Sequence, residues 1–251
     1  MRYYLDQEFN EGFKRGLNLK KFHTIELIQI GVACEDGRTY TAISKDINPK
    51  HCNDWVQENV LQNLVRNYLL GFNEDARKKQ VKLFDNKTIS GQFKVLQGLI
   101  GKTNKQIAKE IYDFINPDLS FPVFSYNNSE VGNPDSSLHK HFNKHNVSAV
   151  NEYYVAHPTF SGYYCDYDHV LFCSLYGNMS QLPPGYPMFM VDLKQKLDET
   201  IKKHFGIKVV TTDDVTKFTQ LPGYPINKNE HDALADAKWN KQLDDFLNSF
   251  S

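Results

Sequence analysis

Long hydrophobic runs are missing from this sequence of 251 residues. No stretch approaches the roughly 18 consecutive apolar residues that a membrane-spanning helix needs. The opening residues, MRYYLDQEF, carry charges where a secretory signal peptide needs an apolar segment. We therefore expect a soluble, cytoplasmic protein with no membrane partner.

Cysteine is scarce, and charge of neither sign is in excess. The four cysteines, Cys34, Cys52, Cys165 and Cys173, form no C-x-x-C pair, so we expect reduced thiols rather than a disulfide scaffold or a structural zinc site. The 29 Lys and Arg residues against 30 Asp and Glu residues leave a formal charge of −1. This balance argues against a strongly basic nucleic-acid coat protein and leaves local binding of nucleic acid open.

The composition is that of a folded domain. Hydrophobic residues make up 40% of the chain and charged residues 24%. We expect residues 1–251 to form a single domain. Residues 117–160 are rich in Asn, Ser, Pro and His and lack clean periodicity, so we interpret them as an insertion with a role of its own.

The first part of the chain has the pattern of consecutive antiparallel strands. Arg2–Phe9 begins with a β-prone run, and Thr24–Cys34 carries apolar side chains at every second position near its end. Asp36-Gly37 then precedes a third run, Arg38–Ser44. An Asp-Gly pair favours the tight turns of hairpins, so we expect these strands to be largely antiparallel neighbours.

Helical periodicity and capping residues follow. They predict helices over Asp54–Leu70, Thr103–Ile115, residues 167–179, the segment from Asp192 to Gly206, and about Glu230–Phe250, with a short strand over Pro187–Val191. Three antiparallel strands followed by alternating helices and strands indicate an α/β protein whose mixed sheet is covered by helices on both faces.

Two acids lie where the first strand should bury its side chains. Asp6 and Glu8 are two positions apart, so strand geometry directs both to the same face. Like charges held together need a counter-ion, and Mg²⁺ or Mn²⁺ prefers such oxygen ligands. The alternative is a solvated edge strand with two acids that bind nothing.

A histidine and an aspartate mark the start of the last predicted helix. His231 lies five residues before Asp236, with the small residues Ala233 and Ala235 between them. This spacing lets the imidazole and the carboxylate approach one metal-bound water molecule. The alternative is a capping aspartate beside an exposed histidine.

A third acidic segment opens the helix predicted over residues 167–179. Asp166 suits a helix cap, and Asp168 lies in the first turn beside Val170 and Leu171. Either acid is a candidate to face the interior.

In the order Asp-x-Glu, aromatic-Asp and His-x₄-Asp, these residues resemble the DEDDh superfamily of 3′-5′ exonucleases, which includes ribonuclease T, oligoribonuclease and the polymerase proofreading subunit. Further segments are similar to the small bacterial and phage 3′-5′ exoribonuclease family first defined on a mycobacterial enzyme. They include Ile28-x-Ile30-Gly31-Val32, Trp55-Val56-x-Glu58-Asn59, Tyr167-Asp168-His169-Val170, Leu182-Pro183-Pro184-Gly185 and His231-x-Ala233-Leu234-Ala235-Asp236. The resemblance covers residues 2–71 and 160–245 and is weak over 72–159. It implies a ribonuclease H-like fold.

The resemblance also implies roles for five residues. Asp6, Glu8, Asp168 and Asp236 would bind two Mg²⁺ ions, for which Mn²⁺ substitutes, and His231 would accept the proton of the attacking water. Asp168 is preferred over Asp166 because the superfamily's acid follows an aromatic residue and precedes apolar helix positions. The products would be nucleoside 5′-monophosphates. Members of the superfamily often dimerise, so a second copy of the chain is a candidate partner.

The substrate is less clear from the residues. Phe9 and Tyr164 could stack on terminal bases or pack in the core, and Tyr164 stands where the superfamily frequently has asparagine. By resemblance we favour single-stranded RNA or RNA 3′ overhangs. The alternatives are a 3′-5′ exonuclease of single-stranded DNA and a non-catalytic nucleic-acid-binding module on the same fold.

Overall fold

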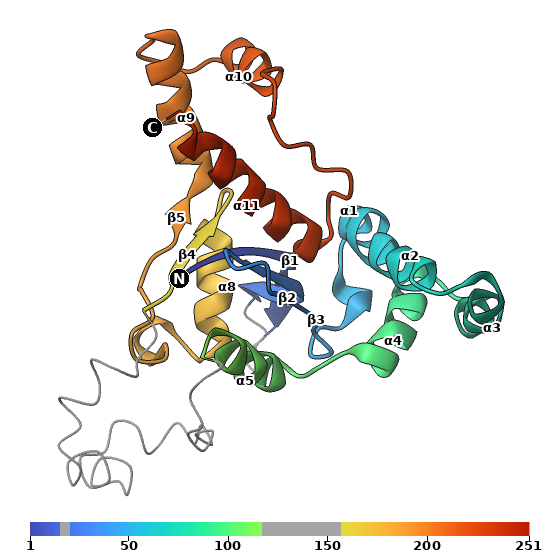
Figure 1. The fold of residues 1–251 in the computed structure, drawn as a ribbon. Coiled ribbons are helices and arrows are strands. Elements are labelled where there is room, and N and C mark those ends of the chain that lie inside the picture. The colour runs from blue at the N-terminus through green and yellow to red at the C-terminus, as the bar shows by residue number, and fades with distance from the viewer. Residues whose placement is uncertain (16–20, 117–156, 251) are drawn as a thin grey trace, which may run out of the picture.

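A mixed five-stranded sheet lies at the centre of the computed structural model, which describes residues 1–15, 21–116 and 157–250 (Figure 1). The strand order is β3-β2-β1-β4-β5. β1 pairs antiparallel with β2 and β2 antiparallel with β3, whereas β4 and β5 are parallel additions next to β1. The bounds are β1 Arg2–Arg15, β2 Lys21–Cys34, β3 Thr39–Ile43, β4 Thr159–Gly162 and β5 Val191–Asp192. The predicted α/β fold with a mixed sheet is confirmed.

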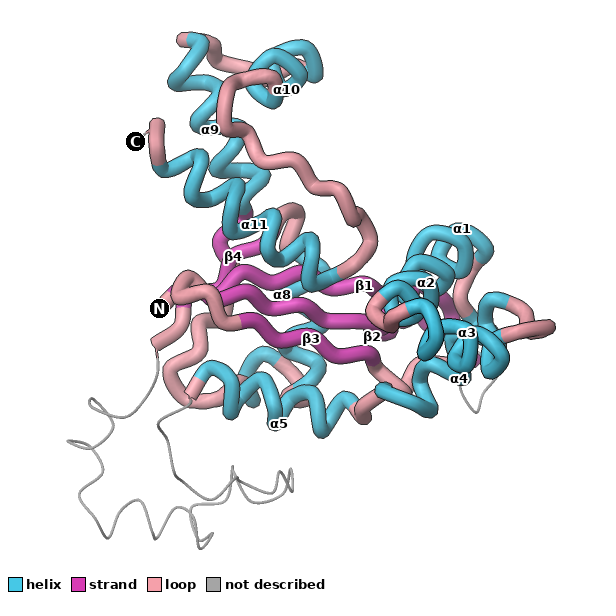
Figure 2. The backbone as a smooth tube through the Cα atoms, turned by 45° about the vertical axis from the view of Figure 1, so that its right-hand side comes forward, coloured by secondary structure: helices cyan, strands magenta, loops and turns pink. Residues whose placement is uncertain are grey.

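Helices cover both faces of this sheet. In Figures 1 and 2, α11 lies over one face and α5 and α8 lie over the other. The helices are α1 Asp54–Val56, α2 Gln62–Leu70, α3 Glu74–Phe84, α4 Ile89–Ile100, α5 Asn104–Ile115, α8 Asp166–Leu175, α9 Leu193–Phe205, α10 Thr212–Thr219 and α11 Ala233–Asn248. A π-helical turn, Gln57–Leu61, joins α1 to α2, and short 3₁₀ helices span Pro49–His51 and Met179–Gln181.

Alternating side chains of β1 enter two different cores, as the two-residue period of a strand requires. Tyr4 packs with buried residues of α9, α10 and α11. Tyr3 and Leu5 point the other way and pack with α5 and α8. The strand that carries Asp6 and Glu8 is therefore buried on both faces at its beginning.

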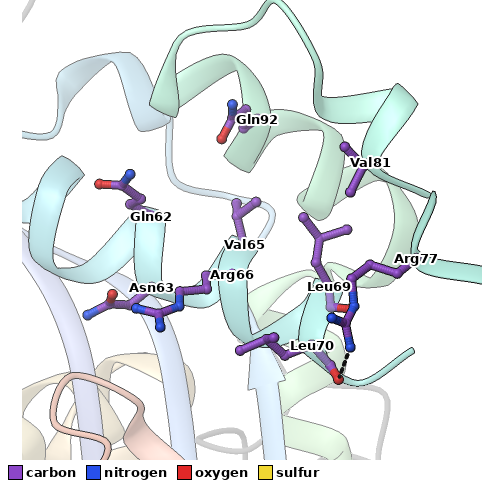
Figure 3. Close-up of a pocket in the computed structure, with 9 residues that line it drawn as sticks. All are labelled: Gln62, Asn63, Val65, Arg66, Leu69, Leu70, Arg77, Val81 and Gln92. Carbon is purple, nitrogen blue, oxygen red and sulfur yellow. Dashed lines mark hydrogen bonds between the residues drawn. The ribbon is translucent and has the colours of Figure 1, made fainter. Parts of the chain in front are cut away.

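A third core lies among α1, α2 and α4, where Val60, Leu61 and Phe93 pack with Ile28 of β2. Beside it, a cavity of about 460 Å³ opens between α2, α3 and α4 (Figure 3). Arg77 lies at its rim and donates hydrogen bonds to carbonyl oxygens at the end of α2. None of the described residues that line this cavity is a carboxylate, so it lies apart from the predicted acidic site.

Several elements differ in length from the sequence-based expectation. β1 continues past Phe9 to Arg15, because β2 pairs with it along its whole length. The strand expected over Pro187–Val191 is reduced to Val191–Asp192, and Met188 and Phe189 are exposed. α8 ends at Leu175, before Gly177 with its positive φ, and α11 begins at Ala233 because the side chain of Asp232 caps it.

The predicted insertion at 117–160 falls mostly outside the described residues. Its last positions, Thr159 and Phe160, belong to β4, and the Phe160 ring is buried in the core below β1. Along the described ranges, no helix has the length and apolar character needed to cross a membrane. All four cysteines are buried free thiols.

Candidate active site

Three carboxylates from distant parts of the chain meet at one place. Asp6 and Glu8 lie on β1, and Asp236 lies in the first turn of α11. One carboxylate oxygen from each lies within 4.8 Å of those of the other two. The Asp-x-Glu spacing thus places both side chains toward the helix that supplies the third acid.

The three carboxylates lie close together because α11 packs closely against the sheet. Gly31 of β2 pairs with Asp6, and a Cβ atom added to Gly31 would lie 2.1 Å from the carbonyl oxygen of Ala233. The buried amide oxygen of Gln29 accepts a hydrogen bond from the Ala233 backbone N–H at 2.9 Å. Glycine at this position is therefore what allows the helix to begin directly against the strand pair and carry Asp236 to the acids.

Asp168 adds a fourth carboxylate from α8. Its side chain is buried, and its Oδ1 atom has no hydrogen-bond partner within the part of the chain that the structure describes. The Gln7 side chain donates to the Asp168 carbonyl oxygen at 2.9 Å and ties α8 to β1. Asp166, the alternative, is exposed. The structure thus directs Asp168 inward and Asp166 to solvent.

The pKa values of the four acids are all raised, first by burial and then by neighbouring negative charge. Burial and the charges of Asp168, Asp236 and Glu8 raise the pKa of Asp6 well above its usual range. Burial, together with Asp236 and Asp168, raises the pKa of Glu8 to about 8.

The other two acids are shifted in the same direction. Burial raises the pKa of Asp168 to about 7 against the effect of a backbone hydrogen bond from Gln7. Burial raises that of Asp236 to about 6, although hydrogen bonds from Asn227 and His231 oppose the shift. The site therefore concentrates negative charge that only protons or cations relieve.

His231 stands at the edge of the acids, on the loop before α11. Its Nδ1 atom is 4.0 Å from Oε1 of Glu8, and 38% of its side chain is exposed. Its φ of 62° is a left-handed conformation that residues with a Cβ rarely adopt. The Trp55 ring packs edge-to-face against the imidazole with centroids 5.1 Å apart, so backbone and packing both fix the histidine's direction.

Several supporting residues were not predicted from the sequence. Trp55, 56% exposed beside His231, belongs to a segment that carries the family resemblance, but its contact could not be read from that segment. The side chain of Asn227 donates to Oδ1 of Asp236, and Asn67 of α2 donates to Asp232 at 3.1 Å. No local pattern marks these two amides, because Asn67 is far from Asp232 in the sequence and Asn227 lies in an irregular loop.

The two predicted base-stacking residues lie in different surroundings. Phe9 is half-buried, and its ring centroid is 5.4 Å from that of Tyr167, the residue before Asp168. Tyr164 is 64% exposed with a φ of 54°, and the Lys194 ammonium lies 5.9 Å from its ring centroid. Phe9 therefore joins the surface next to Asp168, whereas Tyr164 contacts the start of α9.

The donor set fits a hard divalent cation. All four groups are carboxylates, which are the ligands that Mg²⁺ and Mn²⁺ prefer. Across residues 1–15, 21–116 and 157–250, no lysine or arginine forms an ion pair with any of them. The Oδ1 atom of Asp168, which has no hydrogen-bond partner among the described residues, is an acceptor that a cation could use. Asp6, Glu8, Asp168 and Asp236 are thus the residues that could hold metal.

Fold and site together define an α/β protein, compatible with a ribonuclease H-like arrangement, that gathers carboxylates along its first strand. No family model matches the chain. Two individual proteins are similar to it, both named 3′-5′ exoribonuclease, from Mycobacterium tuberculosis strains CDC 1551 / Oshkosh and ATCC 25618 / H37Rv. Each is 24% identical over 238 residues, which cover 95% of this chain and 88% of the relative.

Proposed function

We propose that this protein is a metal-dependent 3′-5′ exoribonuclease that releases nucleoside 5′-monophosphates from the 3′ ends of single-stranded RNA. The observation that carries the proposal is the convergence of Asp6, Glu8 and Asp236 within 4.8 Å, with Asp168 buried beside them. The names of the two similar mycobacterial proteins support the choice of RNA as the substrate and of the 3′ end as the starting point.

The four carboxylates would hold two Mg²⁺ or Mn²⁺ ions. When bound, such ions supply a hydroxide nucleophile near neutral pH and neutralise charge that builds up on a phosphodiester group. The carboxylates themselves need this positive charge, because burial and mutual repulsion favour their protonated forms. We expect metal binding to expel those protons and to leave all four groups ionised.

His231 would act as the general base. Histidine is the side chain that most often accepts and donates protons in catalysis at neutral pH. The imidazole is partly exposed at the rim of the acids, where a water molecule and a phosphodiester group can both approach. Trp55 and the left-handed backbone at His231 would hold the ring in this direction, so that little reorganisation is needed when substrate arrives.

A labelled RNA with a single-stranded 3′ end tests the proposal. We expect progressive shortening from the 3′ end with Mg²⁺ or Mn²⁺, release of 5′-monophosphates, and no reaction in EDTA. A DNA strand of the same sequence, run in parallel, tests the alternative of a DNA exonuclease. Binding of RNA without metal-dependent shortening would instead support a non-catalytic module on this fold.

A further inference from the structure

The outer part of the β1–β2 ribbon has no role in the acidic cluster. We call residues 9–15 of β1 and 21–27 of β2 the arm. The register shifts between Glu8 and Phe9, and beyond this point the two strands pair with each other along the arm. Within the described residues, β3 pairs with β2 no farther than Gln29, and β4 pairs with β1 no farther than Tyr4. The arm therefore continues beyond the sheet from the strand that carries the acids.

Large aromatic side chains are exposed on the arm. Phe13 is 70% exposed and Phe22 is 50% exposed. His23, also exposed, pairs with Phe13 across the ribbon, and the two rings meet edge-to-face with centroids 5.4 Å apart. Exposed aromatic groups on a two-stranded ribbon are an association hazard unless they serve a partner.

The charge of the arm indicates the chemistry of that partner. Lys14, Arg15 and Lys21 lie in the outer half of the arm, whereas Glu11 and Glu26 lie in the half nearer the sheet. Basic residues interleaved with aromatic ones are typical of surfaces that bind single-stranded nucleic acid, where bases stack on rings and phosphates meet cations.

The arm is also continuous with the acidic site. By strand alternation, Phe9 and Phe13 share the face of β1 that Tyr3 and Leu5 occupy, opposite to Asp6 and Glu8 and with Glu11 between them. The link to the site is made through α8, because the Phe9 ring contacts Tyr167, which directly precedes Asp168. Phe13 lies five positions after Glu8, a span of about 17 Å along an extended strand. A chain whose 3′ end lies at the acids could therefore pass over Phe9 and reach the Phe13–His23 pair.

We propose that the arm binds the single-stranded part of the RNA on the 5′ side of the nucleotide being removed. This inference rests on the proposed function and adds a substrate preference to it. The enzyme would cleave longer single-stranded RNA more efficiently than a dinucleotide. A dinucleotide occupies the acidic site alone, whereas a longer single strand also reaches the arm and is held there by stacking and by Lys21.

The test compares substrates of two lengths in the full-length protein. A variant that combines Phe13→Ala, Lys21→Ala and His23→Ala, three positions on one face of the ribbon, should lower the ratio of kcat/KM on a long single-stranded RNA to that on a dinucleotide by about 10-fold, mainly through KM. A matched control combines Met188→Ala and Phe189→Ala, two exposed apolar residues that precede β5, away from the acids; it should leave the ratio unchanged. Lys21→Ala should reduce the salt dependence of RNA binding by about 0.7 in the log–log slope.

Several results would contradict the role of the arm or the proposed function. An unchanged ratio in the triple variant, or an equal loss on both substrates, would overturn the role of the arm. A change in oligomeric state by light scattering without a change in the ratio would identify a contact between copies of the chain instead. If the wild-type protein cleaves neither substrate, the proposed function fails. The arm is then tested by fluorescence anisotropy with the same RNA, for which the triple variant should bind about 10-fold more weakly, and equal affinity would contradict the inference.

Discussion

Gly31 and Ala233 are in such close contact that the first residue of α11 occupies the space a side chain on Gly31 would need. The contact lies opposite Asp6 in the strand ladder, and α11 carries Asp236. The distance between the acids therefore depends on a residue that has no side chain. Gly31 lets the candidate active site form by leaving room for α11, but it takes no part in the chemistry of the site.

Gly31→Ala should displace α11 and separate Asp236 from Asp6. We expect a loss of about 1–3 kcal/mol in the free energy of unfolding, because the obstructing atoms are backbone and cannot rotate away. RNA cleavage should fall further than stability alone explains. The matched control is Gly98→Ala in α4, where an added Cβ meets nothing within 4 Å and stability should rise slightly. Equal behaviour of the two variants in urea unfolding would contradict this account.

His231→Asn should remove the general base and keep the local backbone. Asparagine tolerates the left-handed conformation at this position, so the fold should persist. We expect kcat to fall about 10²–10⁴-fold with an unchanged melting temperature. Turnover near that of the wild type, measured at saturating RNA and metal, would show that a group other than His231 accepts the proton of the attacking water.

The raised pKa values predict how stability of the metal-free protein changes with pH. The acids hold protons in the folded state at pH values where the unfolded chain, with ordinary carboxyl pKa values near 4, has released them. Stability should therefore be greatest below about pH 4 as far as these groups contribute, and this contribution should be lost as the pH rises through about 8, the pKa of Glu8.

Metal should reverse this trend. Mn²⁺ should raise the melting temperature more at about pH 8 than at about pH 5, because fewer protons compete for the carboxylates. Glu8→Gln should stabilise the metal-free protein at the higher pH and weaken the response to Mn²⁺. A response to Mn²⁺ that is the same at both pH values would argue against binding by these acids.

Asp244 offers a prediction about stability alone. Its buried carboxylate accepts hydrogen bonds from Tyr4 at 2.7 Å, Arg2 at 2.9 Å and Lys196 at 2.5 Å. Burial alone would raise its pKa, but the bonds from Lys196 and Tyr4 hold it below the usual range. Asp244→Ala should cost about 3 kcal/mol in unfolding free energy.

The neighbouring position provides the control for that variant. Asp245→Ala removes an exposed pair with Lys241 and should change stability by less than about 1 kcal/mol. Neither substitution should change kcat at temperatures where the variant is folded. A large loss of kcat in folded Asp244→Ala protein would show that the far end of α11 influences the acids.

Much of the fold could be predicted from hydrophobic periodicity and capping residues. Where one face of an element is buried, as in α5 and α9, the spacing of apolar residues predicts the type of the element. α3 buries little beyond Phe84, and β4 has only four residues at the end of a polar segment, so neither has a clear pattern. The arm was missed because Asn10, Glu11 and Gly12 break the alternation that a buried strand requires.

The candidate site was predictable in kind but not in geometry. The order of Asp6, Glu8, Asp168, His231 and Asp236 along the chain carries the resemblance, and the structure gathers these residues around one place. Their approach depends on contacts between distant segments, such as Gln29 with Ala233, that no local pattern encodes. Likewise, the choice between Asp166 and Asp168 depends on the direction of α8, which only packing against β1 fixes.

The most direct test of the central claim compares Asp168→Asn with Asp166→Asn. Both remove one charge from the first turn of α8, but only Asp168 is buried beside Asp6. With 3′-single-stranded RNA and Mn²⁺, we predict that Asp166→Asn cleaves like the wild type. Asp168→Asn should lose at least about 10²-fold in kcat and bind Mn²⁺ more weakly. Wild-type cleavage by Asp168→Asn would contradict the account.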